Sequence, residues 1–219
     1  RNASRPGMPR KPMEIDLYAR RLLAGLEIND TIASIEQSGA KARYIQVDIG
    51  NADQLHATLQ NVQNELGKIT GLVHGAGVLA DGTAEKLRLE DFQRVFDPKV
   101  VGLENILSSL DMNSLSHIAL FSSASAVFGN DGQANYAAAN EWLNNVSLQL
   151  AREHPATQVK AFCWGPWQGG MVDEALARMF TERGISLISK SEGARIFTDQ
   201  LLQSPHDHIR FVVGDDWGG

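Results

Sequence analysis

The sequence predicts an α/β fold built on a parallel sheet with helices on both faces. First, short apolar runs alternate with stretches of helical periodicity along the 219 residues, and such alternation indicates a parallel sheet. Second, several apolar runs end in glycine or small polar residues, at the strand ends where such sheets bind ligands. Third, a hydrophobic content of 43% and a charged content of 21% are ordinary for a soluble globular protein. At this length we expect one domain over residues 1–219.

Local patterns predict the individual elements. Short apolar runs predict strands at residues 42–48, 69–73, 118–121, 159–164 and 209–213. Apolar residues at three- and four-residue steps predict helices at residues 15–28, 31–38, 52–66 and 83–110, through Tyr136 to about 153, and at 189–202. We expect an interruption of the long helix before Pro98, and Ser189 with Glu192 forms a capping box. Residues 1–13, with three prolines, predict a loop, and residues 168–188 predict a mobile segment.

Composition and charge exclude several classes of function. The net charge of −6 argues against a general nucleic-acid binder. The single cysteine, Cys163, cannot form an internal disulfide or build a zinc site alone, so we expect no metal and a buried strand residue at that position. No apolar run approaches the roughly 20 residues of a membrane span, and the polar start does not resemble a signal peptide. We therefore expect a cytoplasmic location without membrane contact.

Residues 121–140 are the most informative stretch of the chain. Ser123 lies at the end of an apolar run, and Tyr136 and Asn140 are four residues apart, so they share one helical face. A hydroxyl that polarises a carbonyl oxygen and a phenol that gives it a proton make a plausible site for reducing a carbonyl. Ser122 and Ser125 are alternatives to Ser123. An ordinary half-buried tyrosine and a surface amide are the structural alternatives for the other two residues.

These residues resemble the short-chain dehydrogenase/reductase superfamily, and most closely the ketoreductase domains of type I polyketide synthases and multifunctional fatty acid synthases. That superfamily usually has the order Asn, Ser, Tyr-x-x-x-Lys. Here the sequence is Tyr136-Ala-Ala-Ala-Asn140 with Lys99 upstream, an exchange typical of the multienzyme ketoreductases. The segments 164–172 and 212–217 resemble polyunsaturated fatty acid synthases and related polyketide synthases. The resemblance implies a Rossmann-like doubly wound sheet.

The resemblance also implies roles for the four residues. Tyr136 would donate the proton, Ser123 would hold the substrate carbonyl oxygen, and Lys99 would favour the phenolate and bond the nicotinamide ribose. Asn140 would position Lys99, with a water between them. A solvated helix lysine is the alternative for Lys99.

The cofactor that the resemblance implies is NADPH. Besides Lys99 and Tyr136, the residues that match the family's cofactor contacts are Arg1, Asp48, His74, Gly75, Ala76, Gly77 and Pro166. Each has a structural alternative: Asp48 as a helix N-cap, the glycines as a tight turn, and Pro166 as the end of a strand.

Three further residues match positions linked to substrate and stereocontrol, namely Asp81, Phe128 and Met171. Asp81 with Phe128 implies a D-hydroxy (B-type) product, although residue 80 is Ala where the family motif usually has Asp. A solvent-facing loop aspartate is the alternative.

The expected function is NADPH-dependent reduction of a 3-ketoacyl thioester on the phosphopantetheine arm of acyl carrier protein, beside the other domains of a multienzyme. The Gly-x-Gly-x-x-Gly phosphate loop of the family is absent from these residues, so we expect an N-terminally incomplete fragment of a larger multienzyme polypeptide. The main alternative is a catalytically silent docking scaffold. A standalone dehydrogenase of small alcohols is a third, against which the Lys/Asn exchange counts.

Overall fold

The computed structural model describes residues 12–170, 172 and 174–215, and the chain divides into two compact units, one up to Gln46 and one from Val47 onward. The first unit contains one helix, α1 (Pro12–Gln37). The sequence predicted two helical pieces here, and the division is wrong. Thr31 donates its hydroxyl hydrogen to the Glu27 carbonyl at 2.7 Å. This polar side chain is therefore hydrogen-bonded within the helix, and the helix continues through it.

The strand predicted at residues 42–48 is also wrong, because no strand is present there. A strand needs ladder hydrogen bonds from a neighbour, and all strand pairs in the described part of the chain lie between β1 and β4. The β-branched composition of 42–48 therefore lacks the partner that would turn it into a strand.

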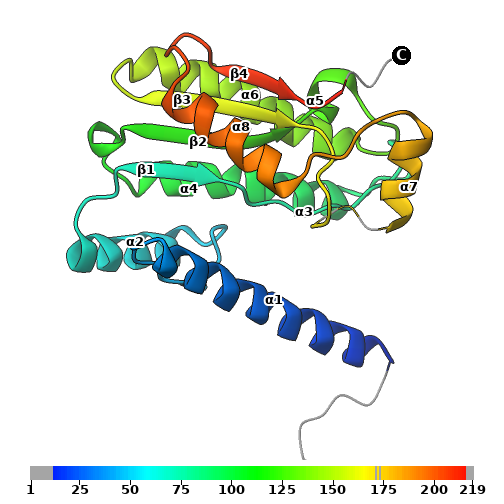
Figure 1. Ribbon diagram of the computed structural model, residues 1–219, viewed down its shortest axis with the longest axis horizontal. Helices are drawn as coiled ribbons and strands as arrows, with labels where there is room; N and C mark the ends of the chain where they lie inside the picture. Colours follow the sequence, from blue (N-terminus) through cyan, green and yellow to red (C-terminus); the bar gives the residue numbers. More distant parts are fainter. Residues whose placement is uncertain (1–11, 171, 173, 216–219) are drawn as a thin grey trace, which may run out of the picture. The chain divides into compact units, whose positions relative to one another are not determined.

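The second unit is built on four parallel strands in the order β1-β2-β3-β4 (Figure 1). They are β1 (Gly71–His74), β2 (His117–Ser123), β3 (Gln158–Trp164) and β4 (Arg210–Val213). Helix α2 (Ala52–Leu66) precedes β1. The connections between the strands contain α3 (Leu89–Lys99), α4 (Val101–Ser108), the short 3₁₀ turn η1 (Met112–Ser114), α5 (Ser125–Phe128), α6 (Ala134–Glu153), α7 (Glu174–Glu182) and α8 (Lys190–Leu202). The fold class predicted from the sequence is confirmed.

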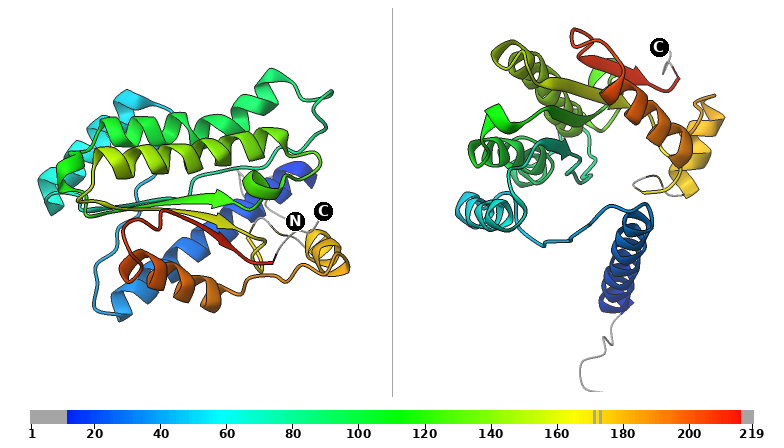
Figure 2. Two further views of the ribbon diagram at one scale, coloured as in Figure 1. Left: turned by 90° about the horizontal axis from the view of Figure 1, so that it is seen from above. Right: turned by 60° about the vertical axis from the view of Figure 1, so that its left-hand side comes forward.

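Helices cover both faces of the sheet (Figure 2), and alternate residues of the central strands pack into two cores. Ile118 and Leu120 of β2 face α4 and α6, where they pack with Leu143. Ala119 faces the opposite side with Leu201 of α8. Because side chains of a strand alternate between faces, burial on both sides explains why this strand is almost continuously apolar.

The long predicted helix 83–110 is two helices. It begins only at Leu89, and it breaks at Val100 rather than before Pro98. Pro98 lies in the last turn of α3, where Val100 N still donates to the Phe96 carbonyl at 2.9 Å. The missing proline amide and the bulk of its ring act on the preceding turn, so Pro98 is tolerated at the end of α3 and the chain breaks two residues after it.

The other helices agree with their patterns more closely. Ser189 accepts a hydrogen bond from Glu192 N at 3.2 Å, as the capping box predicted. The segment 168–188, predicted as mobile, contains α7, and α5 was not predicted. No helix in the described ranges has the length and apolar character needed to cross a membrane.

Candidate active site

A cavity of about 560 Å³ lies beyond the carboxyl ends of the strands. Three of the four predicted catalytic side chains line it: Lys99 from the end of α3, Ser123 from the end of β2, and Tyr136 from the first turn of α6. Parallel strands all end at this edge, and the break after α3 brings Lys99 to the same place.

Lys99 is 3% exposed. Its Nζ donates to the Phe121 carbonyl at 2.9 Å and lies 5.6 Å from the centre of the Tyr136 ring. Burial lowers the pKa of Lys99 from 10.5 to about 8. The ammonium is therefore mostly charged at neutral pH and stands beside the phenol.

Tyr136 has a raised pKa, because burial disfavours the phenolate more than the nearby Asn140 and Ser123 side chains favour it. The phenol therefore keeps its proton at neutral pH. Ser123 Oγ accepts hydrogen bonds from Ser125 N at 3.2 Å and from Ser125 Oγ at 2.9 Å. The Ser123 side chain also favours the Tyr136 phenolate by hydrogen bonding, so the Ser123 hydroxyl and the phenol are neighbours in the cavity lining.

Asn140 lies beneath the cavity and is fully buried. Its Nδ2 donates to the Tyr136 carbonyl at 2.8 Å within α6, while its Oδ1 has no hydrogen-bond partner among the described residues. Asn140 thus makes no direct bond to Lys99. A buried acceptor without a partner is costly, so Oδ1 is a natural point for a bridging water.

The residues predicted to bind the cofactor fall into two groups. Gly75, Gly77 and Pro166 line the cavity, whereas Asp48, His74 and Ala76 do not. Asp48 Oδ1 accepts from Gly50 N at 2.9 Å, and the N-cap of α2 is Asn51, so the N-cap alternative for Asp48 is wrong.

His74 lies in the interior, 2% exposed, and its Nε2 is 3.0 Å from the Lys99 carbonyl oxygen. Arg1 and Met171 lie outside the described residues.

Asp81 also lines the cavity, on the loop between β1 and α3. Its Oδ2 accepts from Gln133 Nε2 at 2.9 Å, and Gln133 Oε1 accepts in turn from Asn130 Nδ2 at 3.0 Å. These bonds tie the Asp81 loop to the segment that leads into α6. Phe128, the other predicted stereocontrol residue, is 43% exposed at the end of α5 and is not part of the lining.

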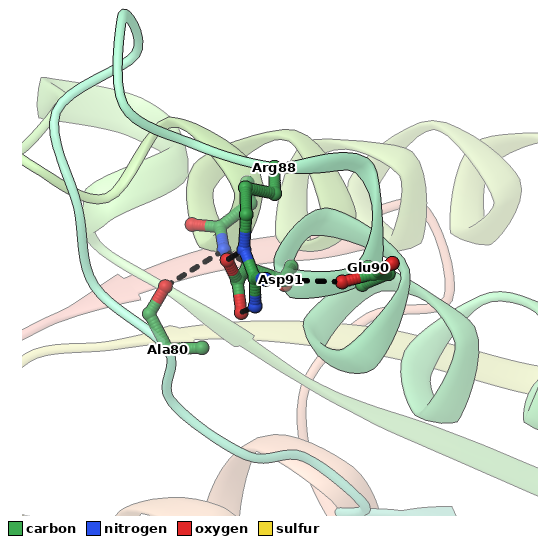
Figure 3. Close-up of polar contacts among 5 residues, drawn as sticks. Ala80, Arg88, Glu90 and Asp91 are labelled. Carbon is green, nitrogen blue, oxygen red and sulfur yellow. Dashed lines mark hydrogen bonds and ion pairs between the residues drawn. The ribbon is translucent and has the colours of Figure 1, made fainter.

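The same loop is braced at its base (Figure 3). Asn135 Nδ2 donates to the Ala80 carbonyl at 3.0 Å and lies 3.4 Å from the Asp91 carbonyl oxygen. Arg88 forms ion pairs with Asp91 at 3.0 Å and Glu90 at 3.3 Å. Since Asn135 directly precedes Tyr136, the brace joins the Asp81 loop to the catalytic turn of α6.

Helix α7 closes one side of the cavity with Leu176, Met179 and Phe180. Beyond this apolar wall, Arg183 and Lys190 line the cavity and are exposed. The sequence interpretation missed these residues as well as Gln133 and Asn135. The spacing of 176, 179 and 180 is a helical apolar face and could have identified α7.

The cavity fits the nicotinamide end of a dinucleotide. Gly75 and Gly77 put no side chain into the lining at their positions, so a planar ring can approach the backbone there. Lys99 and Tyr136 add hydrogen-bonding groups to the same lining. The residues present fit this half of the cofactor.

A parallel sheet whose carboxyl edge holds a buried lysine, a serine and a tyrosine around one cavity defines a site of the short-chain dehydrogenase/reductase class. More particularly, the chain belongs to the KR domain family, whose sequence model matches residues 12–169. KR domains are ketoreductases, oxidoreductases of this class.

Relatives and solved structures agree with this family. The chain is 37% identical over 205 residues to a component of the polyunsaturated fatty acid synthase of Thraustochytrium sp., covering 93% of this chain and 7% of that protein. It is 31% identical over 175 residues to polyketide synthase PksL of Bacillus subtilis, covering 72% and 4%. A solved ketoreductase from the first module of phoslactomycin biosynthesis in Streptomyces sp. HK803 matches with a TM-score of 0.77 at 26% identity, over 85% of this chain and 43% of that one. The chain therefore spans less than a tenth of these curated relatives and under half of the solved ketoreductase.

Proposed function

We propose that this chain carries the catalytic part of an NADPH-dependent 3-ketoacyl reductase that acts on thioesters held by acyl carrier protein, with other domains of a polyketide or fatty acid synthase as its neighbours. The observation that carries the proposal is the meeting of Lys99, Ser123 and Tyr136 around one cavity in a KR-family chain. The roles proposed below for each of the three residues follow from their protonation states and hydrogen bonds.

The proton would come from Tyr136. Its raised pKa keeps the phenol protonated, as an acid must be before it donates to the substrate carbonyl oxygen. The Ser123 hydroxyl, which lines the same cavity, would hold that oxygen in place. The bound cofactor supplies the hydride to the carbonyl carbon. The product is an alcohol, and the phenolate left on Tyr136 is stabilised by the Lys99 ammonium.

Lys99 and Asn140 would support this transfer. The Lys99 ammonium, beside the Tyr136 ring, can also donate to the ribose hydroxyls of the cofactor. Asn140, held to the Tyr136 carbonyl, offers its unpartnered Oδ1 to a water that would link it to Lys99. Gly75, Gly77 and Pro166, which line the same cavity, would lie against the nicotinamide ring.

A carrier-bound substrate is supported by the charges at the α7 side of the cavity. A 3-ketoacyl thioester is itself neutral, yet Arg183 and Lys190 line the cavity, and neither has an ion-pair partner within the described residues. The phosphopantetheine arm of a carrier protein has a phosphate that these cations could bind. The apolar face of α7 would cover the acyl chain.

The proposed stereochemical outcome is the D-hydroxy product. Asp81, fixed by Gln133, stands at the cavity wall where it can direct the thioester to one side of the carbonyl. Phe128 and Met171 are the other residues proposed for substrate control. Chiral chromatography of the reduced thioester checks this proposal, and an L-hydroxy product would overturn it.

A second candidate is a catalytically silent docking scaffold. It is favoured by one observation, the absence of a Gly-x-Gly-x-x-Gly loop from these 219 residues. The two candidates are separated by NADPH oxidation in the natural full-length polypeptide with a 3-ketoacyl thioester. Substrate-dependent oxidation that Tyr136→Phe abolishes supports the reductase, and no oxidation by the unaltered polypeptide supports the scaffold.

A further inference from the structure

His74 ends β1 directly beside the catalytic centre without taking part in the chemistry proposed above. Its side chain is 2% exposed and does not line the cavity. Its Nε2 lies 3.0 Å from the carbonyl oxygen of Lys99. Because a carbonyl can only accept, Nε2 must be the protonated nitrogen. Burial lowers the pKa of His74 to about 4, so the imidazole is a neutral donor throughout the physiological range.

The Lys99 carbonyl needs this donor because of the helix break. In an unbroken helix the amide of Leu103 would donate to it, but α3 ends at Lys99 and α4 starts at Val101. On either side of the break, Val100 N donates to Phe96 and Glu104 N donates to Val100. The bond from His74 replaces the one that the break removes.

Lys99 is consequently held at both ends by the edge of the sheet. Its carbonyl is fixed by His74 at the end of β1, and its ammonium by the Phe121 carbonyl of β2. The two strands are neighbours, with His74 paired to Leu120. The strand register thereby sets where the ammonium stands relative to the Tyr136 ring.

We propose that His74 is a positioning residue for ketoacyl reduction, which holds Lys99 by its main-chain carbonyl so that the ammonium meets both the phenol and the cofactor ribose. This inference rests on the proposed function and refines it. It also gives His74 a role other than direct cofactor contact.

Three substitutions separate this role from mere packing. His74→Gln places an amide N–H the same number of bonds from Cβ as Nε2 and retains the donor. His74→Asn has a donor that is too short, and His74→Leu has none. His56, exposed on α2, provides the control substitution His56→Leu. Thermal melts identify the variants that fold. If His74→Leu does not fold, His74→Asn and His74→Gln still compare a variant without the donor to the Lys99 carbonyl with one that keeps it.

The first measurement is the dissociation constant of NADPH, followed by fluorescence in the full-length polypeptide, together with kcat. We expect His74→Leu and His74→Asn to weaken binding and lower kcat by about 10- to 100-fold, while His74→Gln and His56→Leu stay within about threefold. Combined with Lys99→Met, His74→Leu should add no further loss, because it acts through Lys99. Additive losses, or a Gln variant as impaired as the Leu variant, would overturn the inference.

The second measurement does not depend on activity. Titration of the Lys99 side chain by NMR reports its surroundings, which include the Tyr136 ring, neutral His74, and Asp81 beyond Tyr136. If His74 holds Lys99 in its buried position, His74→Leu or His74→Asn raises the pKa of Lys99 from about 8 toward 10.5, and His74→Gln leaves it low. An unchanged pKa in the first two variants contradicts the inference even where the unaltered polypeptide reduces its substrate. If His74→Leu or His74→Asn raises the pKa of Lys99 but the unaltered polypeptide neither binds NADPH nor reduces thioesters, the positioning role of His74 is supported and only the proposed function is refuted.

Discussion

Burial acts in opposite directions on the protonation equilibria of the two titratable residues that face each other in the cavity. It keeps the Tyr136 phenol neutral and makes the Lys99 ammonium easier to deprotonate. Both effects follow from the low dielectric of the site. The resemblance to known reductases pointed to Lys99, Ser123 and Tyr136, and the structure brings them together. The resemblance named His74 only as a cofactor contact. Its bond to the Lys99 carbonyl could not be read from the sequence, because that bond depends on where the helix breaks.

The buried lysine has a consequence for stability. The pKa of Lys99 is about 8 in the folded protein and 10.5 ordinarily, so the unfolded chain binds more protons between these values. Stability therefore rises with pH through this range. We expect Lys99 to contribute about 2 kcal/mol of added stability at pH 9.5 relative to pH 7. Urea unfolding at both pH values checks this contribution, which should be missing in Lys99→Met. An equal pH dependence in the two proteins would contradict it.

Loss of the phenol should stop chemistry without preventing binding. Tyr136→Phe keeps the ring that packs near Lys99 but removes the acid, and general acids typically contribute 10²- to 10⁴-fold. We expect kcat to fall by about that factor, with the dissociation constant of NADPH changed less than about fivefold. Stopped-flow reduction and cofactor titration measure the two quantities. A variant with normal kcat would show that another group donates the proton.

At the scale of elements, α8 supports one wall of the cavity through a single glycine. A Cβ at Gly193 would overlap the six-membered ring of Trp167, which lines the cavity. Gly193→Ala should therefore displace the indole and raise KM for the thioester by several fold, with loss of stability. Gly25→Ala in α1, where nothing lies within 4 Å, is the control and should stabilise its helix slightly. Steady-state kinetics with thermal melts distinguish the two, and an unchanged KM in Gly193→Ala would refute the coupling.

The cations after α7 and at the start of α8 make a second prediction for this scale. Arg183→Gln and Lys190→Gln should raise KM about five- to tenfold for a phosphopantetheine thioester, because each removes a charged hydrogen-bond donor. A thioester without phosphate should be unaffected. Arg178→Gln, on α7 but outside the cavity lining, is the matched control. Equal effects on both thioesters would exclude a contact with the phosphopantetheine phosphate. A raised KM for NADPH would show that the two cations bind a phosphate of the cofactor instead.

Elements with strong local signals were predictable, and those that depend on partners were not. The runs that became β2 and β3 are largely apolar and buried on both faces, as strands in the middle of a parallel sheet are. Residues 42–48 contain β-branched residues too, but they pair with no strand in the described part of the chain, so composition alone misled. Pro98 signalled a break, yet the helix continues through Pro98 and breaks two residues later, at Val100. The contacts of α7 with the cavity could not be predicted from the sequence, because they depend on how α7 packs in the folded chain.

For the whole molecule, the alternation of strands and helices was enough to predict a parallel sheet with a site at its carboxyl edge. The sequence order of Lys99, Ser123, Tyr136 and Asn140 was enough to point to the ketoreductases, and the family match agrees. The apolar cover and the cations around the cavity come from residues 176–190, whose joint location depends on tertiary structure. The chemistry was therefore more predictable than the substrate contacts.

The central claim is that the cavity transfers a hydride to a ketoacyl thioester while Tyr136 gives the proton. The most direct test uses NADPH deuterated at its transferable position, with mass spectrometry of the hydroxyacyl product formed by the full-length polypeptide. We predict one deuterium on the carbinol carbon of the product, and labelled product forming about 10²- to 10⁴-fold more slowly with Tyr136→Phe. A full-length polypeptide that forms no labelled product, or labelled product at an unchanged rate with Tyr136→Phe, would contradict the claim.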